Sequence, residues 1–308
     1  MRVKLGTLLF LVMSQFGMAA TVVEIGAAPE KGFNFPFLLK IPEQNKTQYL
    51  IVETNNTGKV ADNFAEHYAS AKTAIIGNAI GPWVAKQLNA PILMPVFPRS
   101  EQDWQTYTHA LDRDTLLIKS GNLKRLDLQL LAMINEAKQL LLQHSVPVND
   151  KVIMTGFSAS GTLANRFSVL HPDALQLVVA GGLNGILMLP LGTLKEHTLN
   201  YPLGINDIEK ITGQAFAQSQ WQALPQFLFM GANDTNDAAE YDDAYSEDER
   251  QVIYSAMGRS MQPERWQFCQ DVYAEFQVNV VFKTYQGIGH GTNLAIHQDI
   301  LAFIQSNI

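Results

Sequence analysis

The strongest constraint on the fold is a series of short apolar runs separated by stretches with helical periodicity. The runs are apolar on both faces, which is typical of the buried strands of a parallel sheet. Helical stretches between such strands favour a doubly wound α/β architecture, in which helices cover both faces of a mostly parallel sheet. The expected strands are residues 49–53, 91–97, 151–156, 175–180, 226–230 and 278–284.

The connections between these strands predict helices, one further strand and an insertion. Residues 126–144 carry leucine and alanine at three- and four-residue spacing, which predicts a helix. A second helix is expected over residues 160–170, directly after the third strand. Residues 33–41 favour an antiparallel strand before the first parallel one. Residues 182–224 are too long for a simple crossover, and we interpret them as a cap or lid over one end of the sheet.

The first twenty residues differ in character from the rest of the chain. Arg2 and Lys4 precede an apolar stretch over residues 5–18, and small residues occupy positions 17–20. This three-part pattern is typical of a secretory signal peptide, and the stretch is too short to span a membrane comfortably. We therefore expect cleavage of residues 1–20 and export of residues 21–308, as a single domain, to the periplasm or the medium. An N-terminal membrane anchor is the alternative.

The composition limits the classes of partner and of stabilising site that the chain can have. The formal net charge is −7 at pH 7, which argues against nucleic acid and against an anionic membrane surface as partners. Cys269 is the single cysteine, which excludes an internal disulfide and cysteine-rich zinc sites. Export without a disulfide suits a bacterial periplasm, with the stability supplied by the hydrophobic core. The oligomeric state is left open.

The segment with the most chemical content is GFSASG, residues 156–161, between a buried strand and a helix. A sharp turn at such a junction can lift a serine hydroxyl above the sheet as a nucleophile. The turn requires small residues two positions before and after the serine, and Gly156 and Ser160 meet this requirement around Ser158. Ser160 is the weaker nucleophile candidate, because no glycine stands two residues before it. A serine that merely caps the helix is the alternative.

Two later loops carry the partners that such a serine needs. Asp234 follows the strand at 226–230 in the segment GANDT, and His290 follows the last strand in the segment GIGHG. Serine, acid and histidine thus occur in the order expected for this turn. His290 would take the Ser158 proton and return it to the leaving group, while Asp234 would fix the imidazole tautomer. Asp237 is the alternative acid, and this chemistry needs no cofactor or metal.

The tetrahedral intermediate of acyl transfer needs preorganised N–H donors. One is expected from the backbone of Ala159, at the start of the helix. The second is expected from the loop after the first parallel strand, where Asn56 is favoured and Thr57 is the alternative.

Three residues are candidates for the substrate cleft. Trp104 and Tyr107 are aromatic residues that could line an acyl or aromatic pocket, and His109 follows them in the segment YTHALDR. The simpler hypotheses are packing for the aromatic residues and a structural hydrogen bond for His109.

Residues 240–249, EYDDAYSEDE, form the most acidic stretch of the chain. Carboxylates in such number could bind calcium, but the spaced D-x-D-x-D-G loop is absent. A solvated helix start is therefore the favoured interpretation.

Residues 151–173, KVIMTGFSASGTLANRFSVLHPD, resemble the nucleophile region of secreted esterases of the polyhydroxybutyrate depolymerase and feruloyl esterase type. The GANDT and GIGHG segments resemble the acid and histidine loops of the same family. The resemblance implies an α/β-hydrolase fold and an exported carboxylic-ester hydrolase that acts on a small-molecule or oligomeric ester. Two departures stand out: Ser160 replaces the usual glycine, and Asn55-Asn56 stands where the family usually carries His-Gly.

Two other functions stay open on the same scaffold. A Ser158–His290–Asp234 triad also serves peptidases and amidases. A catalytically inactive binding module is the third hypothesis, because the Asn55-Asn56 departure affects the expected oxyanion loop. The acyl and alcohol parts of the substrate are not readable from the sequence.

Overall fold

In the computed structural model, residues 20–56 and 60–308 are described, and within them eight strands form one sheet. Thr57 and almost all of the expected signal peptide lie outside this part of the chain. The strands of the sheet are β1 (Thr21–Ile25), β2 (Phe37–Ile41), β3 (Ile51–Glu53), β4 (Ile92–Pro95), β5 (Val152–Phe157), β6 (Leu175–Gly181), β9 (Gln226–Gly231) and β10 (Val280–Tyr285).

The sheet confirms the predicted architecture. Its order is β1-β2-β4-β3-β5-β6-β9-β10, and the six strands from β4 to β10 pair in parallel. All six correspond to the expected parallel strands, and β2 is the antiparallel strand expected within 33–41. The edge strand β1 was not predicted, because TVVEI is short, half exposed and adjacent to the expected signal peptide.

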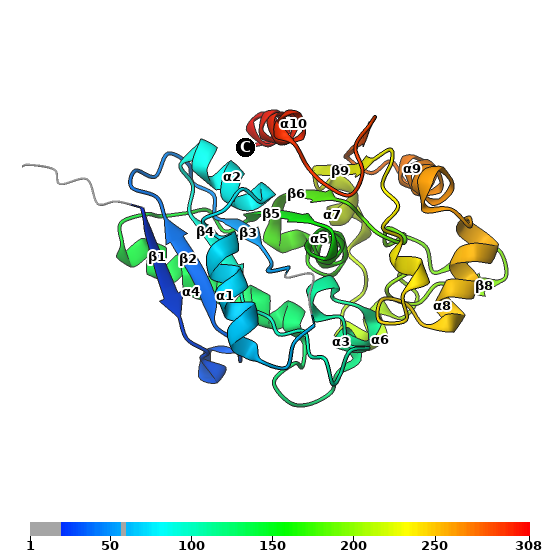
Figure 1. Cartoon of the computed structure of the whole chain (residues 1–308), viewed down its shortest axis with the longest axis horizontal. Helices are drawn as coiled ribbons and strands as arrows, with labels where there is room; N and C mark the ends of the chain where they lie inside the picture. Colours follow the sequence, from blue (N-terminus) through cyan, green and yellow to red (C-terminus); the bar gives the residue numbers. More distant parts are fainter. Residues whose placement is uncertain (1–19, 57–59) are drawn as a thin grey trace, which may run out of the picture.

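Helices cover both faces of the sheet, as Figure 1 shows. On one face, α1 (Phe64–Ala74), α2 (Ile80–Leu88) and α10 (Leu294–Ser306) enclose one hydrophobic cluster. On the other face, α4 (Leu126–Gln143), α5 (Ala159–Leu170) and α9 (Trp266–Glu275) enclose a second and larger cluster. The expected helices at 126–144 and 160–170 are therefore confirmed as α4 and α5.

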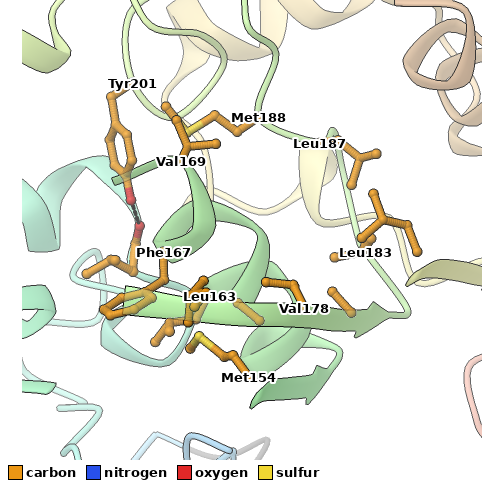
Figure 2. Packing of buried hydrophobic residues seen from close by; sticks show 14 of the residues in the cluster. Met154, Leu163, Phe167, Val169, Val178, Leu183, Leu187, Met188 and Tyr201 are labelled. Atoms are coloured by element: carbon orange, nitrogen blue, oxygen red, sulfur yellow. Dashed lines mark hydrogen bonds between the residues drawn. The ribbon is translucent and has the colours of Figure 1, made fainter. Parts of the chain in front are cut away.

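The two clusters explain why the strand sequences are apolar on both faces. In β5, Met154 faces the larger cluster while its neighbour Ile153 faces the smaller one, because successive strand side chains alternate. Figure 2 shows Leu163 and Phe167 of α5 beside Met154 in the larger cluster. Each fully buried side chain of this kind contributes about 1.5–3 kcal/mol to stability.

The segment between β6 and β9 contains residues 182–224, for which a cap or lid stays a prediction. Its first part packs into the larger cluster, where Leu187, Met188 and Leu189 are buried. Trp221 lies edge-on to Tyr273 of α9, with ring centroids 5.1 Å apart. The insertion contains the hairpin strands β7 (Thr193–Leu194) and β8 (His197–Thr198) and the helices α6 (Ile208–Thr212) and α7 (Gln218–Ala223).

The remaining short helices connect these elements. They are α3 (Arg113–Leu117) and α8 (Glu247–Val252), the 3₁₀ turns Pro29–Lys31, Thr108–Ala110, Pro172–Ala174 and Ala238–Glu240, and the π-helical segments Ile253–Met257 and Met261–Arg265. No helix in the described part of the chain is long and apolar enough to cross a membrane.

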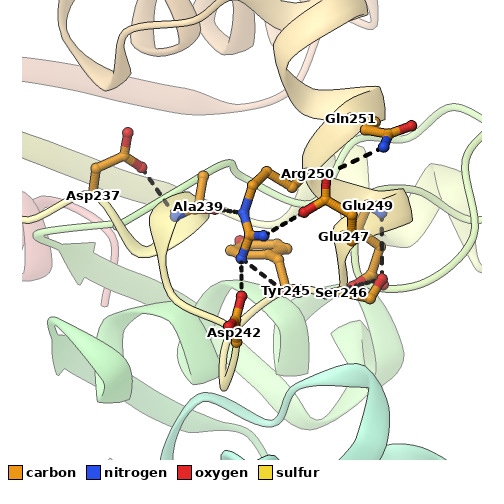
Figure 3. Close-up of polar contacts among 9 residues, drawn as sticks. All are labelled: Asp237, Ala239, Asp242, Tyr245, Ser246, Glu247, Glu249, Arg250 and Gln251. Carbon is orange, nitrogen blue, oxygen red and sulfur yellow. Dashed lines mark hydrogen bonds and ion pairs between the residues drawn. The ribbon is translucent and has the colours of Figure 1, made fainter.

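The acidic stretch 240–249 confirms the helix-start interpretation. Ser246 and Glu249 form a reciprocal capping box at the first turn of α8. Arg250 binds Glu247 and Asp242, each at 2.7 Å, as Figure 3 shows. Glu249 is thus engaged at the helix start, and Asp242 and Glu247 by Arg250, while Asp243 pairs with Arg99. The described residues hold no cluster of three potential metal ligands.

Candidate active site

Ser158 stands at a sharp turn between β5 and α5. Its backbone adopts φ 60° and ψ −129°, a conformation that non-glycine residues rarely occupy. Such strain costs on the order of 1–3 kcal/mol and persists where the surrounding structure holds it. Here the Ser158 N–H donates to Gly181 O at 2.9 Å, and the Ser158 carbonyl accepts from the Thr162 N–H.

The neighbours of Ser158 must be small, as the sequence motif predicts. A Cβ on Gly156 would lie 2.3 Å from the Ser160 carbonyl oxygen, and one on Gly161 would lie 2.5 Å from Gly181 O. Ser160 fits because its hydroxyl folds back: it donates to Phe157 O at 2.8 Å and accepts from Phe157 N at 3.0 Å. Ser160 therefore braces the turn, and its buried hydroxyl is already bonded.

Asp234 and His290 are in direct contact although 56 residues separate them. His290 Nδ1 lies 2.8 Å from Asp234 Oδ2, and the Asp234 side chain is fully buried while that of His290 is 27% exposed. The second Asp234 oxygen accepts the Asn236 N–H at 3.0 Å. This pairing holds the imidazole with Nδ1 as the donor, which leaves Nε2 as a proton acceptor.

Asp237, the alternative acid, is engaged elsewhere. Its carboxylate accepts the Ala239 N–H at 3.0 Å and forms an ion pair with the buried Arg265. The structure therefore pairs the histidine with Asp234 and assigns Asp237 to a structural contact.

The His290 ring lies against the turn that carries Ser158. It packs on Phe157 with ring centroids 4.9 Å apart, and a Cβ on Gly182 would lie 3.1 Å from its Cε1. Its Nε2 is 3.2 Å from the Asn236 side-chain nitrogen. The Ser158 hydroxyl forms no hydrogen bond with any residue of 20–56 or 60–308. Asn236, rather than Ser158, is therefore the partner of His290 Nε2.

Asn236 is a site residue that the sequence reasoning missed. It stands two residues after Asp234 in the segment GANDTND, where polar residues are too common to single it out. Its amide is a hydrogen-bond donor, so it can satisfy the His290 Nε2 lone pair.

The expected oxyanion donors flank Ser158. Ala159 is the first residue of α5, so its N–H has no partner within the helix. Asn56 lies beside the turn from the other side, with its side-chain nitrogen 3.4 Å from Phe157 O. The loop after β3 thus reaches the turn that carries Ser158.

Asn55 has a structural role that the sequence did not predict. Its side chain accepts the Phe97 N–H at 2.9 Å and donates to Phe97 O at 2.9 Å. Its nitrogen also lies 3.2 Å from His109 Nε2. These contacts tie the loop after β3 to the segment after β4, next to the site.

The three cleft candidates have different environments. His109 is fully buried, and burial lowers its pKa to about 3. It bonds to Phe97 O at 2.9 Å, which favours the structural hydrogen bond over a place in the cleft. Trp104 is exposed on the loop after β4. Tyr107 from the same loop lines a small pocket beside Ala159.

Comparison with known proteins supports the fold. No family model matches the sequence, and no curated protein matches it. Among solved structures, poly(aspartic acid) hydrolase-1 from Sphingomonas sp. KT-1 superimposes with a TM-score of 0.60 at 16% identity, over 93% of this chain and 98% of that one. LpqC, a poly(3-hydroxybutyrate) depolymerase from Bordetella parapertussis, superimposes with a TM-score of 0.57 at 17% identity, over 94% of this chain and 90% of that one.

A third structure extends the comparison. An S-formylglutathione hydrolase from Agrobacterium tumefaciens gives a TM-score of 0.51 at 11% identity, over 96% of each chain. At these identities the shared property is the architecture. The chain has the α/β-hydrolase fold, as the resemblance of its three loops implied.

Proposed function

We propose that the protein is an exported serine hydrolase that cleaves carboxylic esters through Ser158, His290 and Asp234. The observation that carries the proposal is the contact between the buried Asp234 carboxylate and His290, whose ring lies against the strained turn of Ser158. A buried carboxylate bonded to Nδ1 is the arrangement that makes Nε2 of a histidine a general base.

The reaction proceeds through an acyl-enzyme. His290 Nε2 exchanges its contact with Asn236 for the Ser158 hydroxyl and takes its proton as Ser158 Oγ attacks the acyl carbon. The Ala159 N–H and the Asn56 N–H from the loop after β3 stabilise the oxyanion. His290 then gives the proton to the leaving alcohol. A water molecule, deprotonated by the same nitrogen, releases the acid and restores Ser158.

Asp234 remains ionised throughout this cycle. It fixes the tautomer and stabilises the imidazolium that forms when His290 accepts the proton. No cofactor or metal enters any of these steps.

The structural neighbours support the hydrolase class and raise a second candidate. Their names describe hydrolysis of a poly(3-hydroxybutyrate) ester and of poly(aspartic acid), and the latter polymer is joined by amide bonds. An amidase or peptidase on the same triad is therefore the second candidate function. Export is part of the proposal because of residues 1–20, and secretion of a reporter fused to them in a bacterial host tests it.

A fluorophosphonate probe tests the nucleophile on the mature chain, residues 21–308. We expect one equivalent of label on the wild type and none on Ser158→Ala. Ser160→Gly is the matched control, since it restores the residue usual at that position and should still label. A folded wild-type protein that takes up no label would contradict the proposal and favour the inactive binding module.

A substrate panel separates the two candidate reactions. We expect release of nitrophenol from 4-nitrophenyl esters at a much higher kcat/KM than release of nitroaniline from peptide anilides. The reverse order would assign the triad to an amidase.

A further inference from the structure

A small pocket lies directly beside the expected oxyanion donor Ala159, with a cavity volume of about 20 Å³. Its floor is one face of α5, formed by Ala159, Thr162 and Arg166 at helical spacing. Its walls come from Tyr107, Asn184 and Tyr245, which lie after β4, β6 and β9. Loops that follow parallel strands meet at the carboxyl edge of the sheet, where Ser158 also stands.

Arg166 is the unusual member of this pocket. It is 2% exposed and forms two hydrogen bonds, to Ala110 O at 2.9 Å and to the Tyr245 hydroxyl at 3.1 Å. An arginine has five N–H donors, so three have no partner among the described residues. A buried charge without a counterion costs several kcal/mol.

No carboxylate within 4.0 Å compensates this charge in residues 20–56 and 60–308. Asp112 and Glu249 act on Arg166 only from farther away. Burial raises the pKa of both carboxyls, and the pKa of about 7 for Asp112 leaves that group only partly ionised near neutral pH. Arg166 is therefore a buried cation with no carboxylate in direct contact within the described residues.

Two other polar groups of the pocket also have hydrogen-bonding capacity without a partner among the described residues. The Tyr245 oxygen accepts N–H groups from Arg166 and Ile186, and its own proton has no acceptor in the described part of the chain. The Asn184 oxygen is buried without a partner. Because a terminal amide can turn by half a rotation, Asn184 can present its N–H groups instead. A carboxylate, with about four acceptor positions, matches this excess of donors.

We propose that this pocket binds a carboxylate on the acyl part of the substrate, so that the preferred esters are monoesters of short dicarboxylic acids. The proposal rests on the proposed function, because it places the acyl group on Ser158. A water molecule fits the cavity but leaves the Arg166 charge uncompensated.

The separation between Ala159 and Arg166 along α5 sets the length of the acyl group that the pocket would accept. Seven residues separate Ala159 from Arg166, which is about 10 Å along the helix axis. The arginine side chain leans back toward the helix N-terminus and shortens this gap. An acyl chain of a few carbons, such as succinyl or glutaryl, therefore places its far carboxylate at the guanidinium while its ester carbonyl is at Ser158.

The first test uses the wild-type mature protein. Methanol release is measured from monomethyl succinate and monomethyl glutarate, with methyl butanoate and methyl pentanoate as neutral analogues of similar length. We expect kcat/KM to be at least about 10-fold higher for the acidic esters, as a charged hydrogen bond of about 1.5–3 kcal/mol allows. Equal or faster hydrolysis of the neutral esters would overturn the proposal.

Variants then assign the effect to the pocket. In Arg166→Met the ratio of kcat/KM for acidic over neutral esters should fall at least about 10-fold, mainly through KM. Tyr245→Phe, which keeps the ring and the packing, should lower the same ratio about threefold. If Arg166→Met does not fold, the Tyr245→Phe variant still tests the pocket. Arg125→Met removes an arginine that is paired with Asp127 and should leave the ratio unchanged.

The outcomes for the two proposals differ. A protein that labels with fluorophosphonate but keeps its ester ratio in the Tyr245→Phe variant rejects the carboxylate pocket alone. A folded protein that does not label rejects the serine hydrolase and the carboxylate pocket together.

Discussion

The acid–histidine side and the acyl-pocket side of the site differ in how completely their polar groups are paired. On the first side, both Asp234 oxygens and His290 Nδ1 have partners within the described chain that the proposed reaction keeps, whereas His290 Nε2 contacts Asn236. On the second side, three Arg166 N–H groups and the Asn184 oxygen have none. The Asp234–His290 contact is therefore preorganised by the protein itself, whereas the proposed acyl pocket would be completed by a ligand.

This difference has an energetic meaning. A hydrogen bond that is already formed costs no reorganisation during the reaction, which is the basis of electrostatic preorganisation. Each buried polar group without a partner costs about 1–3 kcal/mol, and a substrate that satisfies it recovers that energy on binding. Changes on the first side should therefore act on kcat, and changes on the second side on KM.

The largest expected effect is on the preorganised side, from Asp234→Asn. The amide cannot hold the imidazole with Nδ1 as the donor, so kcat should fall by about 10⁴-fold with little change in fold. Steady-state ester hydrolysis measures it. Asp237→Asn is the matched control, because it removes the contact to Arg265 and should affect stability more than kcat. A larger loss of kcat in Asp237→Asn would reverse the assignment of the acid.

The next effect concerns the acyl side and its dependence on pH. Burial raises the pKa of Asp112 from 3.8 to about 7, so the folded protein binds its proton more tightly than the unfolded chain does. This stability is fully present below pH 3.8 and is lost as the pH rises to about 7, by at most about 4 kcal/mol.

Asp112→Asn should remove that loss while keeping an oxygen for the Thr115 N–H. Urea unfolding of both proteins at pH 5 and pH 8 measures the difference. If the wild type loses no more stability than the variant between these pH values, Asp112 is ionised in the fold and could act as a counterion for Arg166.

The third prediction tests how tightly the turn that carries Ser158 is packed. Gly156→Ala places a Cβ 2.3 Å from the Ser160 carbonyl oxygen, so the turn must shift. We expect a loss of unfolding free energy of about 3 kcal/mol, measured by urea unfolding. Gly26→Ala is the control, because a Cβ there meets no atom within 4 Å. Equal stability of the two variants would mean that the turn is not tightly packed.

The smallest expected effect comes from Asn236→Ala. Asn236 competes with Ser158 for His290 Nε2 through a contact of 3.2 Å. A neutral hydrogen bond of about 0.5–1 kcal/mol corresponds to a rise in kcat/KM of about two- to fivefold when it is removed. Asn233→Ala in the same loop is the control. A fall in kcat/KM would show instead that Asn236 positions the histidine for the reaction.

The sequence by itself determined the parallel strands, the sharp turn at Ser158 and the order of the three proposed catalytic residues. These features depend on contiguous residues: runs apolar on both faces, and Gly156 and Ser160 spaced around Ser158. The export signal at residues 1–20 stays a prediction, since it lies almost entirely outside the described residues. The resemblance of three short segments was enough to name the fold, because those segments contain the local geometry of the turn and its partner loops.

Other features were decided only by the tertiary structure. The sequence favoured Asp234 and kept Asp237 as the alternative, and only the fold separates them, by the contact of Asp234 with His290 and the ion pair of Asp237 with Arg265. Arg166 is the single charged residue of ASGTLANRFSVL, which is a visible signal, but its pocket partners Asn184 and Tyr245 come from loops far along the chain. Such contacts have no periodicity, because they arise where the ends of parallel strands converge, and only the assembled sheet brings them together.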